Sequence, residues 1–116
     1  IHPSAIAGAT VEIGVGAFLA AGSIAIADAK IGRGAILNTG CSVDHDCIIG
    51  DGAHIAPGVR LCGTVTVGAR TLIGVGSAVR PGIRIGSDVV IGAGSAVVAD
   101  IPDGVVYAGC PARALG

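Results

Sequence analysis

The segment Asp44-His45-Asp46 gathers three ionisable side chains in a chain that has few of them. Charged residues make up only 13% of the 116 residues, so a cluster of this kind stands out. Carboxylates beside an imidazole fix its orientation and favour its protonated form, which suits a general base that works near neutral pH. A solvated turn, in which aspartate caps backbone amides, is the other interpretation of these residues.

Two later residues extend this candidate site. His54 follows His45 by nine residues, and Gly63 follows it by 18. A glycine leaves its backbone N–H unshielded, and an acyl-transfer site needs such a donor for the oxygen that becomes negatively charged. A simple turn glycine is the alternative interpretation. What these spacings mean in space depends on the elements that carry the residues.

Those elements are set by a period of six. An aliphatic residue or alanine occupies every sixth position from Ile1 to Val97 without insertion or deletion. This period fits neither a helix nor a single strand, and hexapeptide repeats indicate a parallel β-helix whose coils bury their apolar face by stacking. We therefore predict an all-β solenoid over residues 1–102, with about 18 residues per triangular coil. Pro102 ends the repeat, and residues 103–116 form a C-terminal capping tail.

The coil length predicts which residues stack. Gly63 should lie directly above His45, whereas His54 should lie half a coil away and point in another direction. In a threefold assembly, His45 of one subunit could face His54 of the next, so the spacing predicts a site between subunits. With a strand spacing of roughly 4.8 Å, the prism should be about 27 Å long.

One corner should consist of glycine at every level. Five glycines follow one another at intervals of 18, namely Gly14, Gly32, Gly50, Gly68 and Gly86. We expect this corner to need a residue in the left-handed conformation, which glycine adopts without steric cost.

The composition is consistent with a narrow interior and gives no pattern of a disulfide-bonded or zinc-binding protein. Hydrophobic residues make up 52% of the chain, but Phe18 and Tyr107 are its only aromatic residues. Cys41 and Cys47 fall at inward positions and are expected in the core, whereas Cys62 and Cys110 form no disulfide or zinc pattern. We therefore expect a reducing, cytoplasmic setting.

The charge and hydropathy of the chain indicate which kinds of partner it can bind. A net charge of -1 with a single lysine gives no basic surface for nucleic acid or an anionic membrane, and no apolar run is long enough to cross a bilayer. An open solenoid of this size leaves apolar flanks that other subunits usually cover, so we expect an oligomer. The chain has no methionine and begins in phase with the repeat, from which we expect a domain of a longer protein.

The repeats, such as Ile49-Gly50-Asp51-Gly52-Ala53-His54, resemble those of the left-handed parallel β-helix (hexapeptide-repeat) acyltransferases. More narrowly, residues 37–50, with Asn38-Thr39 and Asp44-His45-Asp46, resemble the sialic-acid O-acetyltransferase type and the bacterial nucleotide amino-sugar N-acetyltransferases. So does the ending Gly109-Cys110-Pro111-Ala112-Arg113. The resemblance implies a homotrimer that transfers acetyl from acetyl-CoA, without a metal, to the amine or hydroxyl of a sugar or nucleotide-linked sugar.

The resemblance also implies a role for individual residues. His45 would be the general base, Asp46 would orient and polarise it, and His54 would contact the acetyl or substrate end of the site. The Gly63 N–H would hold the thioester oxygen, and Asn38 and Asp44 would bind substrate. Coenzyme A would run toward the C-terminal end, against backbone amides at Gly74, Gly76 and Gly92, with Arg80, Arg84 and Arg113 as phosphate partners. In this family an N-terminal nucleotide-sugar-binding domain commonly precedes the helix, and we expect that it is missing from this chain.

Two other functions fit the same fold. A metal-dependent hydratase of the γ-carbonic anhydrase type shares three histidines between subunits, but His2 lies more than two coils from His45 and cannot readily complete a tetrahedral site with His45 and His54. A non-catalytic trimeric scaffold would keep the prism without the chemistry. Acetyl-CoA binding distinguishes the scaffold from the enzyme.

Overall fold

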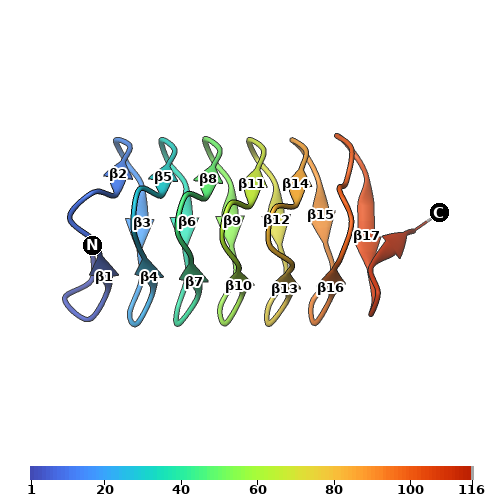
Figure 1. The fold of residues 1–116 in the computed structure, drawn as a ribbon, viewed down its shortest axis with the longest axis horizontal. Helices are drawn as coiled ribbons and strands as arrows, with labels where there is room; N and C mark the ends of the chain where they lie inside the picture. The colour runs from blue at the N-terminus through green and yellow to red at the C-terminus, as the bar shows by residue number, and fades with distance from the viewer. Residues whose placement is uncertain (116) are drawn as a thin grey trace.

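A computed structural model describes residues 1–115 as a triangular prism of stacked coils, in which every regular element is a short strand (Figure 1). The strands form three sheets, one per side of the prism, and all their pairings are parallel except that of β18 with β17. Sheet A contains β1 (Ile6–Ala7), β4 (Ile24–Ala25), β7 (Ser42–Val43), β10 (Arg60–Leu61), β13 (Ala78–Val79) and β16 (Ala96–Val97). Sheet B contains β2 (Glu12–Ile13), β5 (Lys30–Ile31), β8 (Ile48–Ile49), β11 (Thr66–Val67) and β14 (Arg84–Ile85). Sheet C contains β3 (Phe18–Leu19), β6 (Ile36–Leu37), β9 (His54–Ile55), β12 (Leu72–Ile73), β15 (Val90–Ile91), β17 (Val106–Ala108) and β18 (Arg113–Ala114).

The register confirms the predicted coil. From β1 to β13, each strand pairs with the strand three elements later, so that Ile6 lies beside Ile24 and Leu37 beside Ile55. The architecture is the predicted all-β, left-handed parallel β-helix. We name its edges the A–B corner, the B–C corner and the C–A corner, after the sheets that each edge joins.

The last coil is shorter than the others. Ile85 bridges to Ile101, and Ser87 N–H donates to Asp103 Oδ1, 16 residues later. Two residues are therefore missing from the last A–B corner, after β16. β17 then pairs with β15, and β18 turns back on β17 in antiparallel fashion to cover the end of the prism (Figure 1). The molecule is 40 Å long, more than the predicted 27 Å, because this tail extends beyond the stacked coils.

From β3 to β16, the second residue of each strand is buried and belongs to the core. Leu37, Ile55 and Ile73 follow one another along sheet C and are fully buried. Small residues at the corners complete the packing, and Cys41 and Cys47 are among them, as predicted. Burial raises the pKa of the Cys41 thiol to about 11 and also raises that of Cys47. These two thiols are therefore unreactive core groups.

The expected reason for the glycine series at the B–C corner is wrong. None of these five glycines has a positive φ. A Cβ atom on Gly32 would instead lie 2.6 Å from the backbone nitrogen of Asp51, and one on Gly50 would lie 2.6 Å from that of Ala69. Glycine is required there because the next coil passes too close for any side chain. The left-handed residues of this corner come two positions later: Gly16, Gly34, Gly52, Arg70 and Asp88.

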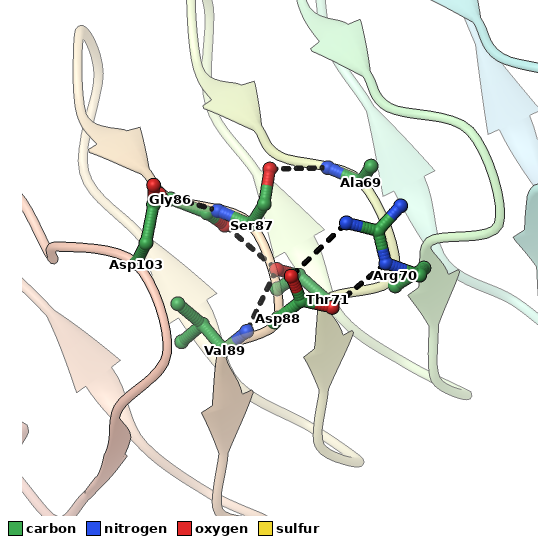
Figure 2. A network of polar contacts seen from close by, with 8 residues as sticks. All are labelled: Ala69, Arg70, Thr71, Gly86, Ser87, Asp88, Val89 and Asp103. Carbon is green, nitrogen blue, oxygen red and sulfur yellow. Dashed lines mark hydrogen bonds and ion pairs between the residues drawn. The ribbon is translucent and has the colours of Figure 1, made fainter.

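Toward the C-terminal end of this corner, Arg70 and Asp88 occupy the left-handed position in place of glycine (Figure 2). Arg70 Nε and Nη2 donate to the two carboxylate oxygens of Asp88 at 2.8 and 3.0 Å, and this contact lowers the pKa of Asp88. Ser87 Oγ accepts a hydrogen bond from Ala69 N–H, and Ser87 N–H donates to Asp103. The polar network therefore ties the last three coils together where the repeat ends.

Every regular element of the described residues is a strand, and the sequence contains no apolar run long enough to cross a bilayer. Within residues 1–115, no helix is long and apolar enough to cross a bilayer.

Candidate functional site

His45 lies at the A–B corner between β7 and β8, with each neighbouring aspartate in a different role. Asp44 Oδ1 accepts a hydrogen bond from His45 N–H at 3.0 Å, which caps the turn. Asp46 has a φ of 57° and places Oδ2 3.1 Å from His45 Nδ1. One carboxylate thus caps the turn and the other holds the imidazole, and the role of His45 as general base stays a prediction. Substrate binding by Asp44 stays a prediction.

The contact with Asp46 fixes the tautomer of His45. An ionised carboxylate only accepts hydrogen bonds, so Nδ1 carries the proton and Nε2 keeps a free lone pair. The His45 side chain is 53% exposed, so this lone pair can be reached from outside the prism. A neutral imidazole with an accessible Nε2 has the geometry of a general base.

Gly63 lies against the imidazole ring of His45, one coil above. A Cβ atom added to Gly63 would have Nε2 as its nearest neighbour, with Cε1 at 2.5 Å and Cδ2 at 2.9 Å. Thr64 N–H also donates to the carbonyl oxygen of His45 at 2.9 Å. The stacking predicted from the 18-residue spacing is confirmed, and glycine is needed at position 63 because any side chain would displace the imidazole.

The Gly63 N–H has no acceptor within residues 1–115. Amides at the same place in other hexads, such as those of Ala21 and Ala93, also lack one in this part of the chain. The free N–H is therefore a property of the turn, and what distinguishes Gly63 is the imidazole nitrogen beside it. A donor and a base next to each other are the two groups that acyl transfer requires.

Thr64 is a residue that the sequence interpretation overlooked. Its φ is 61°, which is rare and strained for a β-branched residue. Its Oγ1 donates to the Gly63 carbonyl oxygen at 2.6 Å. The signal was present in the repeat, because Thr64 follows Asp46 by 18 residues and must take the same left-handed turn. This strained residue comes directly after the candidate oxyanion donor.

His54 lies on β9 in sheet C, away from the A–B corner that holds His45. The two histidines therefore do not meet within one prism, as the half-coil spacing predicted. Asn38, where the chain leaves β6, places Nδ2 3.1 Å from His54 Nε2. Both side chains are half-buried. Whether His54 faces His45 of another subunit stays a prediction.

The glycines assigned to coenzyme A lie at the C–A corner, and their N–H groups are already used. Gly74 N–H donates to Ile91, Gly76 N–H to Pro57 and Gly92 N–H to Tyr107. These amides hold the coils together, so they are not the free donors that the prediction required. A contact of coenzyme A with the three glycines stays a prediction. A Cβ on Gly76 would meet no atom within 4 Å, whereas one on Gly74 would lie 2.6 Å from the backbone nitrogen of Ala93 and one on Gly92 would lie 2.9 Å from Ala108 Cβ.

The arginines divide into two groups. Arg33 lies 3.9 Å from Asp51, Arg70 pairs with Asp88, and Arg60 donates to the Gly40 carbonyl oxygen. In the described part of the chain, the other three guanidinium groups have no hydrogen-bond or ion-pair partner: Arg80, Arg84 and Arg113. These are the three residues predicted to bind phosphates. All are exposed toward the C-terminal end of the prism.

The third histidine lies apart from the other two. His2 precedes β1, and its Nδ1 accepts a hydrogen bond from Ser4 N–H at 3.0 Å. Among residues 1–115, no group of three or more His, Cys, Asp or Glu side chains could hold a metal ion.

Comparisons with known proteins agree on one family. The model described as "Bacterial transferase hexapeptide (six repeats)" matches residues 28–63, and "Hexapeptide repeat of succinyl-transferase" matches residues 64–99. A comparison with curated proteins gives no match.

Several solved structures are closely similar to this chain. PerB from Caulobacter crescentus, in complex with CoA and GDP-perosamine, is 47% identical over 100% of this chain and 56% of its own, with a TM-score of 0.99. The acetyltransferase domain of PglB from Neisseria gonorrhoeae, in complex with acetyl coenzyme A, is 40% identical over 98% of this chain and 56% of its own, with a TM-score of 0.96. WeeI from Acinetobacter baumannii is 31% identical over 97% and 56%, with a TM-score of 0.94. This chain thus spans little more than half the length of these proteins, and it belongs to the bacterial hexapeptide-repeat transferase family.

Proposed function

We propose that this chain is the catalytic prism of an acetyl-CoA-dependent sugar N-acetyltransferase in which His45 is the general base. One observation carries the proposal: the unprotonated Nε2 of His45 points at Gly63, whose N–H has no acceptor within residues 1–115. Similarity to PerB, solved with CoA and GDP-perosamine, favours an amine on a nucleotide-linked sugar as the acceptor. The homologous acetyltransferase domain of PglB was solved with acetyl coenzyme A.

The residues at the A–B corner divide the reaction between them. Acetyl-CoA supplies a thioester whose carbonyl carbon accepts the amine. His45 Nε2 takes a proton from the amine as the C–N bond forms, and the Gly63 N–H donates to the carbonyl oxygen as it becomes negatively charged. The Asp46 carboxylate stabilises the imidazolium by accepting a hydrogen bond from Nδ1–H. His45 then returns the proton to the thiolate as the C–S bond breaks.

The charge distribution fits a cofactor that carries phosphates. Arg80 and Arg84 flank the A–B corner one coil above Gly63, and Arg113 lies on the capping tail. Their guanidinium groups, free of partners within residues 1–115, would hold the phosphates of coenzyme A. Asp100 lies beside Arg84, where its carboxylate accepts the Arg84 backbone N–H, so we expect Arg80 and Arg113 to contribute more to binding than Arg84.

The site would be completed by a second copy of the chain in a homotrimer. The outward residues of sheet C are apolar on both sides of His54, and Phe18, Leu72, Val90 and Val106 remain exposed. A neighbouring prism that covers this face would bury these side chains. It would also place the His45 of the neighbouring subunit beside His54 of the first.

A thiol-release assay with nucleotide-linked amino sugars tests the activity. We expect CoA release with the amino sugar and at least a hundredfold less with His45→Ala. The matching sugar with a hydroxyl in place of the amine should react poorly. Failure to bind acetyl-CoA and to release CoA with any acceptor would leave a scaffold as the function. Preference for the hydroxyl sugar would make the protein an O-acetyltransferase.

Mixed trimers test the interface. His45→Ala and His54→Ala subunits should each be nearly inactive alone. If the two histidines of one site come from different subunits, equal mixing with random assembly restores about a quarter of the sites. A mixture as inactive as its components would place both histidines of a site in one chain and contradict the arrangement.

We also propose a cellular location for the protein. The four cysteines are unpaired in the structure, which supports a reducing, cytoplasmic location. An N-terminal nucleotide-sugar-binding domain remains a prediction, and an acceptor assay on the complete gene product would test it.

A further inference from the structure

The side-chain amide of Asn38 has its orientation fixed without reference to His54. Asn38 Oδ1 lies 2.7 Å from the backbone nitrogen of Thr39 and 3.3 Å from Thr39 Oγ1. The Thr39 N–H can only donate, so the atom that faces it must be the amide oxygen. An exchanged amide would set two N–H groups against each other, and Nδ2 is therefore the atom on the side of His54.

That orientation determines the protonation of His54. Asn38 Nδ2 lies 3.1 Å from His54 Nε2 and can only donate. Nε2 must then be unprotonated, and the proton of the neutral imidazole is on Nδ1. The apolar side chains of Ile36 and Leu72 lie beside His54 in the sheet, so water competes less for this hydrogen bond.

The three histidines of the chain are consequently held in different ways. His45 is protonated on Nδ1 by its contact with Asp46, which leaves its exposed Nε2 as a base. His54 is also protonated on Nδ1, but its Nε2 is occupied by Asn38, which leaves the Nδ1–H without an acceptor among residues 1–115. His2 accepts from Ser4 at Nδ1 and is protonated on Nε2.

We infer that Asn38 is a positioning residue that holds His54 as the Nδ1–H tautomer, so that His54 acts as a hydrogen-bond donor and not as a second base. The tautomer follows from the contacts of Asn38 alone. The donor role toward the acetyl or acceptor oxygen rests on the proposed function. Asn38 would thus act through His54, because its oxygen is taken by Thr39 and one N–H by His54.

Nitrogen NMR of the imidazole rings tests the tautomer without any activity measurement. At about pH 8, where exposed imidazoles are neutral, long-range proton–nitrogen correlations distinguish protonated from unprotonated ring nitrogens. We expect His54 to show protonated Nδ1 and His2, the internal contrast, to show protonated Nε2. The unmodified protein decides the matter, and a protonated Nε2 on His54 would overturn the assignment.

Asn38→Asp separates the two contacts of Asn38. The carboxylate still accepts from Thr39 N–H, so the turn is kept, but it cannot donate to His54. The His54 tautomer should invert to Nε2–H, while the pattern of His45 stays unchanged. Thr39→Val, which removes only the weaker hydroxyl contact, should leave His54 as it is. A tautomer that does not respond to Asn38→Asp would contradict the positioning role.

Activity distinguishes a donor from a base. The side-chain amide of Asn can place an N–H near the position of imidazole Nδ1, so His54→Asn should retain activity within about tenfold of the parent, whereas His54→Ala loses about a hundredfold. His45→Asn should be as inactive as His45→Ala, because an amide is no base. Equal losses in His54→Asn and His54→Ala would contradict the donor role. If the parent itself transfers no acetyl group, the proposed function fails, and the NMR assignment is judged separately.

Discussion

The A–B corner and the C–A corner make the same turn with different residues. At the C–A corner, the left-handed position is glycine at every level: Gly22, Gly40, Gly58, Gly76 and Gly94. At the A–B corner it is occupied by Asp28, Asp46 and Thr64 before Gly82 appears. A residue with a side chain costs about 1–2 kcal/mol in this conformation. The comparison shows that the prism tolerates this cost along the corner that carries the candidate site.

Several side chains at left-handed positions make specific contacts. Asp46 orients His45, and Arg70 pairs with Asp88 across two coils of the B–C corner. Asp28 shows no such side-chain contact within residues 1–115, and aspartate is among the residues that tolerate the conformation best. A left-handed residue other than glycine is thus a signal of function only together with the contacts that its side chain makes.

Removal of the base should have the largest effect and should affect only the A–B corner. We expect His45→Ala to lower turnover by about 10²–10⁴-fold. Its stability should stay within about 0.5 kcal/mol of the parent, since the His45 side chain is 53% exposed. Steady-state kinetics and thermal unfolding check the two effects, with His2→Ala as a surface control. Full activity in His45→Ala would remove His45 from the mechanism.

Two glycine substitutions should separate chemistry from folding. Gly63→Ala forces the imidazole away from the site, and we expect a loss of about a hundredfold in turnover with little change in stability. Gly22→Ala at the C–A corner has ordinary space around its Cβ but a φ of 67°. It should lose about 1–2 kcal/mol of unfolding free energy and keep its turnover. If both variants behaved alike, the two corners would not differ in the way described above.

The same contrast shows what the sequence could predict. The period of six determines the coil, the inward residues and the placement of Gly63 above His45, because the strands before the last coil pair at intervals of 18 residues. It does not report how close two coils approach, so the glycines of the B–C corner were explained by the wrong property. The tautomers of His45 and His54 could not be predicted from the sequence either, because each depends on a single hydrogen bond, to Asp46 and to Asn38 respectively. Which amides of the C–A corner are free and which are occupied depends on how the coils stack in space.

Asp46 should have an intermediate effect, and two substitutions separate its contributions. Asparagine tolerates the left-handed conformation and can still accept from Nδ1–H, but it does not stabilise the imidazolium. We therefore expect Asp46→Asn to lose about tenfold in turnover, the scale of one hydrogen bond to a charged group, at unchanged stability. Asp46→Ala should lose more turnover and about 1 kcal/mol of stability as well. Equal stability of the two variants would show that the conformation at position 46 carries no strain.

The smallest expected effect is a gain in stability at the A–B corner. Thr64 holds a β-branched side chain at a φ of 61°, and Thr64→Gly removes that strain while it loses the hydroxyl contact with the Gly63 carbonyl. Glycine also gives the unfolded chain more freedom, which offsets about 0.4–1 kcal/mol of a strain of about 1–2 kcal/mol, and the lost contact offsets a little more. We therefore expect a net gain of less than about 1 kcal/mol. Denaturant unfolding at equal protein concentration measures this gain. The control Thr66→Gly on β11, where the backbone is extended, should instead destabilise the protein.

A loss of stability in Thr64→Gly would show that the threonine turn is unstrained. A gain accompanied by lower turnover would show that the threonine holds the Gly63 amide in place at the expense of the fold.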